Sequence, residues 1–437
     1  MAKKQLTIEE KLEAALVPVE EQPYKVPENW CWVKFSVTYD NVSSSKNKIK
    51  QKDYQNEGKF AIVDQGENLI GGYSNNEGIV YDGELPVIIF GDHTRRIKYV
   101  DFPFIQGADG VKVLQPKNYI VPRYYFFCLQ SMQIPHMGYR RHFPILNKMG
   151  FPIAPIAEQS RIVARIEALF AKLDEAKEKI QEVLDGADLR RAAILHQAFT
   201  GKLTEKWRRE KGVSDDSWKE TNLQNVCLTK ITDGTHKTPK YTTKEEGGVP
   251  FISAKDVTQG EICWDNIKYI IPELHEELYA RLAPQRNDIL LAKNGTTGVA
   301  AIVDTDKVFD LYVTLAVLRP NTDIIYPRYL LHIVNSPICK RQFDERLKGI
   351  GVPNLHLRDI KEVIIKIPFV PEQQEIVRLL DTLLSREQST VTACEEALTT
   401  IDNLKKSILA RAFRGELGTN DPSDPSAKEL LREILSA

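Results

Sequence analysis

Two long stretches of the chain, residues 157–203 and 372–417, place apolar residues at alternating three- and four-residue steps. This spacing predicts a helix with one narrow apolar face. Neither stretch contains a proline, and Gly201 and Gly415 suit the helix ends. Each helix is expected to run about 42 residues, or about 63 Å at about 1.5 Å per residue. The predicted apolar seam comprises Ile162, Ile166, Leu169, Leu173 and Ile180 in the first stretch, and Leu380, Leu383, Ala397, Ile401, Leu404 and Ile408 in the second.

The two stretches are copies of one repeat. Residues 158–203 and 372–417 align without a gap at an offset of 214, and 14 of the 46 positions are identical. Gly186 disturbs the seam of the first copy, while Glu387 and Thr390 interrupt that of the second. A narrow apolar seam needs a partner, so we expect the two helices to pack on each other, antiparallel. The alternative is that each helix belongs to the core of its own domain.

The segments that precede the two helices have the pattern of mixed α/β globules. Short β-rich runs such as ELPVIIFGDH and NDILLAKNGTTGVAAIV are separated by Gly, Asn and Asp turns, and helical patterns follow them. The predicted class is therefore α+β, with two mixed α/β globules separated and joined by two long antiparallel helices in a duplicated, pseudo-two-fold arrangement. The expected order is an N-terminal segment (1–24), a first globule (25–156), a helix (157–203), a linker (204–217), a second globule (218–371), a second helix (372–417) and a C-terminal segment (418–437) that packs near the N-terminal one.

Charge and composition set limits on function. The chain carries 59 Lys and Arg against 60 Asp and Glu, a net charge of -1, which argues against unaided binding of many DNA phosphates. Its six cysteines form no CxxC pair, so they indicate reduced thiols and not a zinc site. The charged start lacks a secretory signal and no run reaches 18 apolar residues, so we expect a cytoplasmic protein without a membrane span.

Catalytic motifs are missing from the sequence. It contains no [ND]PP[FY] or FxGxG string of an amino-methyltransferase and no GxxxxGK[ST] string of an ATP-driven motor. Asp53, Glu57 and Lys59 only faintly match a nuclease metal site, and the eight histidines form no HxxxH pair. The glycines of KNGTTG lie between two strand-like runs and predict a hairpin turn. We therefore expect no catalytic residue and no metal site.

Local clusters of donors offer contacts to DNA all the same. Four lysines alternate at spacing two and would project from one face of an extended segment, as a phosphate-tracking stripe. A donor-rich turn follows the apolar run VIIF, and arginine there can pair with guanine, as asparagine can with adenine. The alternative to DNA binding for each cluster is a solvated surface loop. The candidates are Lys46, Lys48, Lys50 and Lys52; His93, Thr94, Arg95, Arg96 and Lys98; Tyr139, Arg140, Arg141 and His142; and His236, Lys237, Lys240, Lys255, Lys293, Asn294, Thr296 and Thr297.

Taken together, these motifs resemble the DNA-specificity subunit of a Type I restriction-modification system. The strongest marks are the repeated helices, which start at PIAEQSRIV and VPEQQEIV and end at ILHQAFTGKL and ILARAFRGEL. PENWCWV, NDILLAKNGTTGVAAIV and GVPNLHLRDIKEVIIKIPFVPEQQ support them, and the resemblance covers essentially the whole chain.

The resemblance implies a non-catalytic subunit. Each globule would be a target recognition domain that reads one half of a split sequence in double-stranded DNA, and the helix pair would fix the distance between the half-sites. The helices would also hold two modification subunits, which carry S-adenosylmethionine, and restriction subunits that use ATP and Mg²⁺ would join them. Phe199 and Phe413, in the repeated Ala-Phe pair, are candidates for the partner interface, although core packing explains them equally well. Two alternatives stay open, namely a self-contained nuclease or methyltransferase with an unrecognised site, and a scaffold that does not bind DNA.

Overall fold

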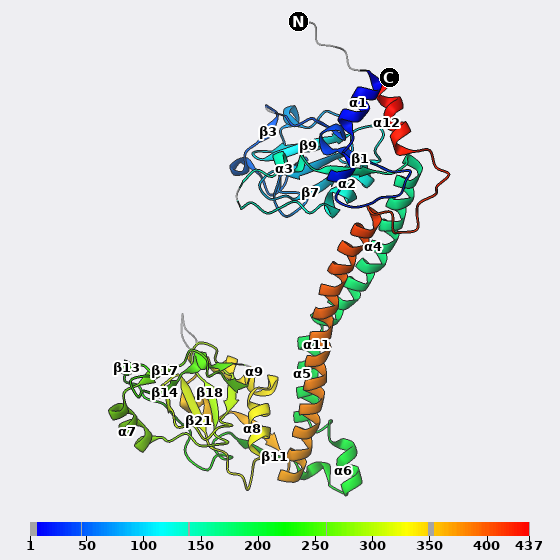
Figure 1. Cartoon of the computed structure of the whole chain (residues 1–437). Coiled ribbons are helices and arrows are strands. Elements are labelled where there is room, and N and C mark those ends of the chain that lie inside the picture. The colour runs from blue at the N-terminus through cyan, green and yellow to red at the C-terminus, as the bar shows by residue number, and fades with distance from the viewer. Residues whose placement is uncertain (1–6, 45, 139, 259, 348–353, 437) are drawn as a thin grey trace. The chain divides into compact units, whose positions relative to one another are not determined.

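The computed structural model describes residues 7–44, 46–138, 140–258, 260–347 and 354–436. The chain divides into two compact units (Figure 1). Unit 1 consists of the chain up to Ile180 together with Glu396 onward, and unit 2 runs from Gln181 to Glu395. Unit 1 therefore contains both ends of the chain, and each unit is described separately below.

Unit 1 is built around two four-stranded sheets. One has the order β2 (Tyr39–Asn41), β9 (Val111–Pro116), β6 (Val87–Gly91) and β7 (Ile97–Val100). The other has the order β3 (Lys48–Ile49), β8 (Phe104–Gly107), β4 (Phe60–Val63) and β5 (Gly72–Ser74). Strand β6 explains why both faces of the first sheet are covered, because Ile88 and Phe90 belong to one apolar core and Val87 and Ile89 to another.

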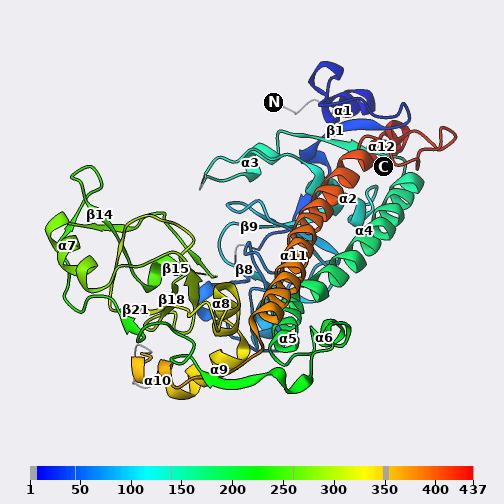
Figure 2. The same ribbon diagram turned by 90° about the horizontal axis from the view of Figure 1, so that it is seen from below.

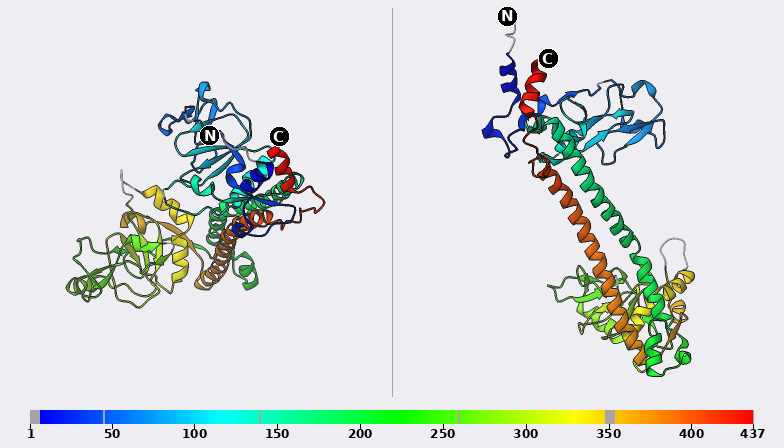
Figure 3. Two further views of the ribbon diagram at one scale, coloured as in Figure 1. Left: turned by 45° about the horizontal axis from the view of Figure 1, so that its top comes forward. Right: turned by 90° about the vertical axis from the view of Figure 1, so that its right-hand side faces the viewer.

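Two further pairings belong to unit 1. Strand β1 (Cys31–Lys34) pairs antiparallel with β10 (Gly150–Ile153), and helices α2 (Pro122–Ser131) and α3 (Phe143–Leu146) lie between these strands in the sequence. Helix α1 (Ile8–Ala15) packs against α12 (Ala427–Ser436), so these two helices, far apart in the sequence, lie side by side (Figure 3). Leu12 and Leu431 bring both helices into the same apolar core.

Unit 2 repeats this plan with its own sheets. Their orders are β12 (Thr232–Asp233), β21 (Leu315–Leu318), β18 (Ile289–Ala292), β19 (Ala300–Ile302), and β13 (Tyr241–Thr242), β17 (Lys268–Ile270), β14 (Val249–Ile252), β20 (Asp310–Leu311). The antiparallel register of β18 and β19 confirms the hairpin predicted for KNGTTG. Strand β18 divides two cores as β6 does, with Ile289 and Leu291 on one side and Leu290 and Ala292 on the other.

Helices and two small sheets surround these strands. Strand β11 (Lys219–Asn222) pairs with β22 (Ile364–Ile367), and β15 (Val257–Thr258) pairs with β16 (Glu261–Ile262). Helix α7 (Pro272–Arg281) lies beside the sheet that contains β14 (Figure 2). The remaining helices of the unit's globule are α8 (Pro327–Val334), α9 (Pro337–Arg346) and α10 (Leu357–Lys361), and α6 (Glu205–Lys211) precedes β11.

The two repeat copies form helices, but only the second is uninterrupted. Helix α11 runs 43 residues from Val370 to Ala412, whereas the first copy forms α4 (Ile156–Asp185) and α5 (Ala187–Phe199). The prediction of one helix over 157–203 is therefore wrong at Gly186. A Cβ at this position would lie 2.7 Å from Nη1 of Arg190. The glycine thus gives room for the Arg190 guanidinium to donate to the Val183 carbonyl at 2.7 Å.

The same arginine explains an interruption of the second seam. Nε and Nη2 of Arg190 donate to Glu387 Oε1 at 3.0 and 2.7 Å. Within unit 1, ion pairs also join the two repeat copies, between Asp174 and Lys405 and between Lys177 and Asp402. Glu387 therefore replaces an apolar seam contact with an ion pair.

The predicted seam positions are buried to different degrees, and Ile162 and Ile166 belong to the apolar core of unit 1 and Leu380 to that of unit 2. Ile162, Ile166 and Leu380 are fully buried and Ile401 nearly so, while Leu169, Leu173, Ile180, Leu383, Ala397 and Ile408 are half-buried. Leu404 is 46% exposed, so its assignment to the seam is wrong. Leu409, 6% exposed, packs with the globule of unit 1 instead, because the end of α11 buries a face at the true helical period and not at the 3.5-residue period of a coiled coil.

Phe199 and Phe413 lie in the cores of their units. Their side chains are 3% and 0% exposed. Phe413 makes an edge-to-face contact with Tyr124 at 5.1 Å, and Phe199 makes the same contact with Tyr329 at 5.3 Å. Neither ring is accessible to a partner, which corrects the candidate partner interface.

Candidate nucleic-acid interface

In unit 1 the fold brings members of three predicted clusters to one cavity. Lys48 on β3, His93 after β6 and Arg141 before α3 all line a cavity of about 590 Å³. The sequence separates these residues widely, and no pattern along the chain indicates that they meet. The remaining lining residues are Asn41, Ser43, Ser44, Asp92, Gln106, Gly107, Asp109, Gly110, Val111 and Lys112, most of them polar or charged.

Buried hydrogen bonds hold the loops around this cavity. Asp92, 3% exposed, accepts from the backbone N–H of Phe143 at 2.8 Å and thereby caps α3. His142, fully buried, has Nδ1 3.0 Å from the Asp92 carbonyl oxygen. His142 is thus a structural residue and not a DNA contact, which corrects its prediction. Because these bonds fix the backbone next to it, the exposed side chain of Arg141 stands on a rigid support.

The turn after β6 does not present all of its donors outward. Lys98 is 6% exposed and lies 3.4 Å from Asp64 Oδ1, so its prediction as a DNA contact is wrong. Burial lowers the pKa of Lys98, and Asp64 opposes that effect. Arg95 adopts φ of 59° and donates from Nη1 to the Ile134 carbonyl at 2.9 Å. Arg96 stays exposed and pairs with Glu67 at 2.9 Å.

Two other predictions in unit 1 need qualification. Thr94 is exposed, but its hydroxyl donates to the Gln65 carbonyl at 2.7 Å. Lys52 lies in the short helical turn Gln51–Asp53, so the predicted extended stripe of four lysines ends at Lys50. Lys46, Lys48, Lys50, Lys52 and Arg140 are all exposed, while Tyr139 lies outside the described residues.

In unit 2 a buried aspartate connects two predicted clusters. Asp233, 4% exposed, lies 2.7 Å from Nζ of Lys293 and 3.2 Å from Nε2 of His236. The side chain of Lys293 is only 9% exposed, so this lysine faces inward and its prediction as a DNA contact is wrong. His236 remains 71% exposed. The loop of His236 and the β18–β19 turn therefore form one surface with Asp233 beneath it.

The other donors of that surface are accessible to different degrees. Lys237 is exposed and pairs with Glu277 at 3.5 Å, and Lys255 is exposed with Asp256 at 3.7 Å. Lys240 and Thr296 are exposed, whereas Asn294 and Thr297 are half-buried.

Sequence reasoning missed the role of the strongest identities in the repeat. Gln159 accepts from the Val121 N–H at 2.8 Å and donates to the carbonyls of Tyr119 and Ala154 at 3.1 and 2.9 Å. Gln373 makes the same three kinds of bond, with the Tyr326 N–H at 2.7 Å and the Ile324 and Pro368 carbonyls at 2.9 and 2.7 Å. Both glutamines are fully buried, so each ties the start of its helix to a globule.

The glutamate before each glutamine is also fully buried. Glu158 accepts from Trp30 Nε1 at 2.7 Å and from Asn420 Nδ2 at 2.9 Å. Glu372 accepts from Trp218 Nε1 at 3.2 Å and from Arg208 Nη1 at 2.7 Å. The sequence signal for this contact was the tryptophan before each globule's first strand, together with the Glu-Gln pair at the start of each helix.

Within the described ranges, no group of three or more His, Cys, Asp or Glu side chains is arranged to hold a metal ion. Of the helices in those ranges, none combines the length and the apolar composition needed to cross a bilayer.

Comparison with known proteins identifies the family. The model of the Type I restriction modification DNA specificity domain matches residues 33–185 and 215–396, more than half of the 437 residues. The chain therefore belongs to the Type I restriction-modification DNA specificity family.

Individual relatives agree with this. The chain is 28% identical over 302 residues to the EcoBI specificity subunit of Escherichia coli, a match that covers 66% of this chain and 61% of the relative. It is 29% identical over 282 residues to the EcoKI specificity subunit of E. coli K12, covering 63% and 58%. The matched region thus spans less than two thirds of either curated relative. The crystal structure of the HsdS subunit from Thermoanaerobacter tengcongensis has a similar fold, with a TM-score of 0.58, 19% identity and coverage of 91% of this chain and all of that one.

Proposed function

We propose that this chain is the DNA sequence-specificity subunit of a Type I restriction-modification complex. Each unit's globule reads one half of a bipartite target in double-stranded DNA. The chain itself carries out no chemistry. Modification subunits that dock on the helices supply S-adenosylmethionine and methyl transfer, and restriction subunits supply the use of ATP and Mg²⁺. The site of action is the cytoplasm, where chromosomal DNA is present.

One observation carries this proposal, namely that the family match occurs twice, once in each globule. The exposed polar clusters give each globule its own means of contact. In unit 1 the proposed contacts are Lys48, His93 and Arg141 around one cavity. In unit 2 they are His236 and Lys237 with the neighbouring turn residue Thr296.

The internal bonds of each unit support a duplicated, pseudo-two-fold design. In unit 2, Glu372 binds Arg208 and Thr204, which follow the first helix in the chain. In unit 1, Glu158 binds Asn420 and Thr419, which follow the second helix. The C-terminal segment therefore supplies partners for the buried glutamate of unit 1, as the linker does for that of unit 2. The proposed domain order requires this.

The helix pair sets the separation of the half-sites in this proposal. The 43 residues of α11 span about 65 Å at about 1.5 Å per residue. At about 3.4 Å per base pair this corresponds to an upper bound of roughly 19 base pairs between the half-sites. The target therefore consists of two read segments with an unread gap between them.

The proposal is tested on the complex of this chain with a modification subunit. Replacing Lys48 with alanine removes one phosphate contact, so DNA affinity falls for all sequences and the slope of log affinity against log salt decreases by about 0.9. Arg141→Ala instead relaxes the preference at one base of one half-site. Lys25→Ala, an exposed lysine of unit 1 outside the cavity, is the control and leaves both measurements unchanged.

Two outcomes would favour the alternatives. Methylation or cleavage of DNA by the purified chain alone, with Mg²⁺ and S-adenosylmethionine, would identify it as a self-contained enzyme. Binding by the complex that depends on neither sequence nor salt would favour a scaffold without a role in DNA recognition.

A further inference from the structure

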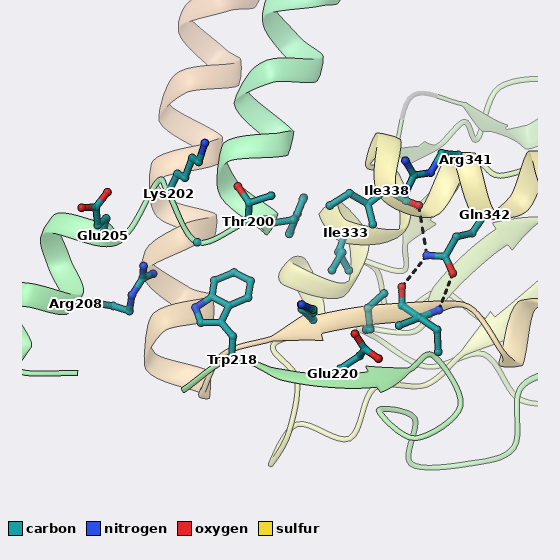
Figure 4. A pocket seen from close by; sticks show the side chains of 15 residues that line it. Thr200, Lys202, Glu205, Arg208, Trp218, Glu220, Ile333, Ile338, Arg341 and Gln342 are labelled. Atoms are coloured by element: carbon teal, nitrogen blue, oxygen red, sulfur yellow. Dashed lines mark hydrogen bonds between the residues drawn. The ribbon is translucent and has the colours of Figure 1, made fainter. Parts of the chain in front are cut away.

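Unit 2 contains a cavity of about 760 Å³ beside the end of α5 (Figure 4). Its apolar surface comes from Trp218 before β11 and from Ile333 and Ile338 on α8 and α9. Lys202 and Arg341 flank it, both with exposed side chains. Such a cavity with an aromatic wall and cations at its rim is suited to bind an amphipathic group.

The equivalent place in unit 1 can be found from the helix repeat. The offset of 214 matches Thr200 and Gly201, which line the cavity, with Arg414 and Gly415. Gly201 and Gly415 share a left-handed backbone, with φ of 78° and 76°. The turn that borders the cavity is therefore the same in both units.

Strand pairing identifies which residue of unit 1 corresponds to Glu220, a second part of the cavity lining. Glu220 on β11 lies opposite Lys366, and Trp32 on β1 lies opposite Pro152. Trp218 and Trp30 precede these strands in the same way and bind the equivalent glutamates. Glu220 in the cavity thus corresponds to Trp32 in unit 1.

Helix packing identifies which residue of unit 1 corresponds to Ile333, a third part of the cavity lining. The Tyr329 hydroxyl donates to the Lys366 carbonyl at 3.1 Å, and the Tyr124 hydroxyl donates to the Pro152 carbonyl at 2.9 Å. These tyrosines occupy the same position in α8 and α2. Four residues further on, Ile333 in the cavity corresponds to Cys128.

In unit 1 the chain's own N-terminal segment covers the equivalents of Thr200, Gly201 and Glu220. The Tyr24 ring lies edge-on to Trp32 at 4.9 Å and beneath the Arg414 guanidinium at 5.3 Å. Burial raises the pKa of the Tyr24 hydroxyl, with a smaller contribution from Cys128. Pro27 sits so close to Gly415 that any Cβ there would collide with it.

We infer that the cavity of unit 2 is a docking site for an extended segment of a partner polypeptide that carries an aromatic side chain. The aromatic ring enters beside Glu220 and Ile333, which hold the places of Trp32 and Cys128 in unit 1. Over Gly201 the place of Pro27 is taken by Trp218, whose Cε2 lies 3.3 Å from the Cβ position of that glycine. Lys202, Arg341 and Lys366 outnumber Glu205 and Glu220 around the cavity, so carboxylates next to the aromatic residue favour binding. This site goes beyond the proposed recognition of DNA and does not depend on it.

The chain's own sequence provides the probe. A peptide of residues 18–28, PVEEQPYKVPE, carries the tyrosine and two glutamates before the ring. With benzophenone in place of the Tyr24 ring, it is expected to cross-link the full chain at residues that line the cavity, without DNA present. Replacing its tyrosine with alanine weakens binding on the order of tenfold, as for loss of an anchoring aromatic side chain.

A matched pair of variants tests the location. Thr200→Trp fills the cavity from an exposed position and weakens peptide binding by about tenfold. Thr382→Trp is the control, because Thr382 is also exposed and also donates to the carbonyl four residues before it, but lies outside the cavity. Equal melting temperatures of the two variants establish that both fold.

Three results would overturn the inference. Cross-links at Trp32, Cys128 or Arg414 would mean that the peptide merely displaces the segment of unit 1. Unchanged affinity in Thr200→Trp would place the peptide elsewhere. A concentration-dependent dimer that Tyr24→Ala abolishes would assign the cavity to a second copy of this chain. Since each measurement is made without DNA, failure of this site is distinct from failure of the proposed function.

Discussion

Removal of the Glu372 carboxylate should destabilise unit 2 strongly. The side chain is fully buried, and its Oε1 lies 2.7 Å from Nη1 of Arg208, whose side chain is 7% exposed. Glu372→Ala removes the carboxylate that accepts from this guanidinium, and breaking a buried ion pair from one side costs about 3–5 kcal/mol. Trp218 and Thr204 also lose their acceptor.

The size of unit 2 converts this energy into a temperature. The unit runs from Gln181 to Glu395. For domains of about 150–250 residues, each kcal/mol shifts the transition by about 2–4 °C, so Glu372→Ala should lower it by about 6–20 °C. The joint replacement of Glu372 and Arg208 by methionine should cost less than either single change, because no buried charge remains.

Thermal unfolding followed by tryptophan fluorescence, with hydrogen exchange at β11 and β22, measures the effect. Glu375→Ala is the control, since Glu375 occupies the same helix but pairs with a side chain of Arg378 that is 63% exposed. Such a surface pair contributes no more than about 1 kcal/mol. Glu158→Ala should cost less than Glu372→Ala, because the direct donors to Glu158 are the neutral groups of Trp30, Thr419 and Asn420. A loss for Glu372→Ala as small as that for Glu375→Ala would refute the reasoning.

Three further predictions follow from the structure. Leu409→Ala should cost about 2–5 kcal/mol in urea unfolding, whereas Leu404→Ala should change stability by no more than about 0.5 kcal/mol; equal losses would restore Leu404 to the seam. Burial raises the pKa of the Asp310 carboxyl, and its hydrogen bond to His275 opposes this effect. Protonation of Asp310 therefore stabilises the folded chain below the ordinary pKa of about 3.9, and this stabilisation is lost as the pH rises through the raised pKa. Asp310→Asn should therefore stabilise the chain at neutral pH and lose that advantage in acid, and a difference constant across pH would contradict this. Inserting four residues at matched positions of α4 and α11 should lengthen the unread gap in methylation maps and leave both half-sites unchanged.

The helix repeat could be predicted because its information is local. An apolar period, a run without proline and a final glycine each act within a few residues, so the extents of α11 and of the first repeat copy follow from them, but not the division into α4 and α5. One exception has a tertiary cause. Glu387 interrupts the second seam because it binds Arg190, nearly 200 residues away in the chain. No local pattern contains that partner.

The candidate site shows the same division. Turn and charge patterns indicated Lys48, His93 and Arg141 as separate clusters, and only the sheets of unit 1 bring them to one cavity. Lys98 and Lys293 look like their neighbours in sequence, but Asp64 and Asp233 hold them inward. A buried partner far along the chain decides whether a lysine is a contact or a structural residue.

The most direct test of the central claim is a map of DNA methylation in cells that express this chain with a Type I modification subunit. If the chain is the specificity subunit that we propose, the map contains a single split motif with a gap of fixed length. Exchange of the globule of unit 1 for that of another family member should change one half-site and leave the other half-site and the gap unchanged. A continuous motif, or a change in both half-sites after the exchange, would contradict the account.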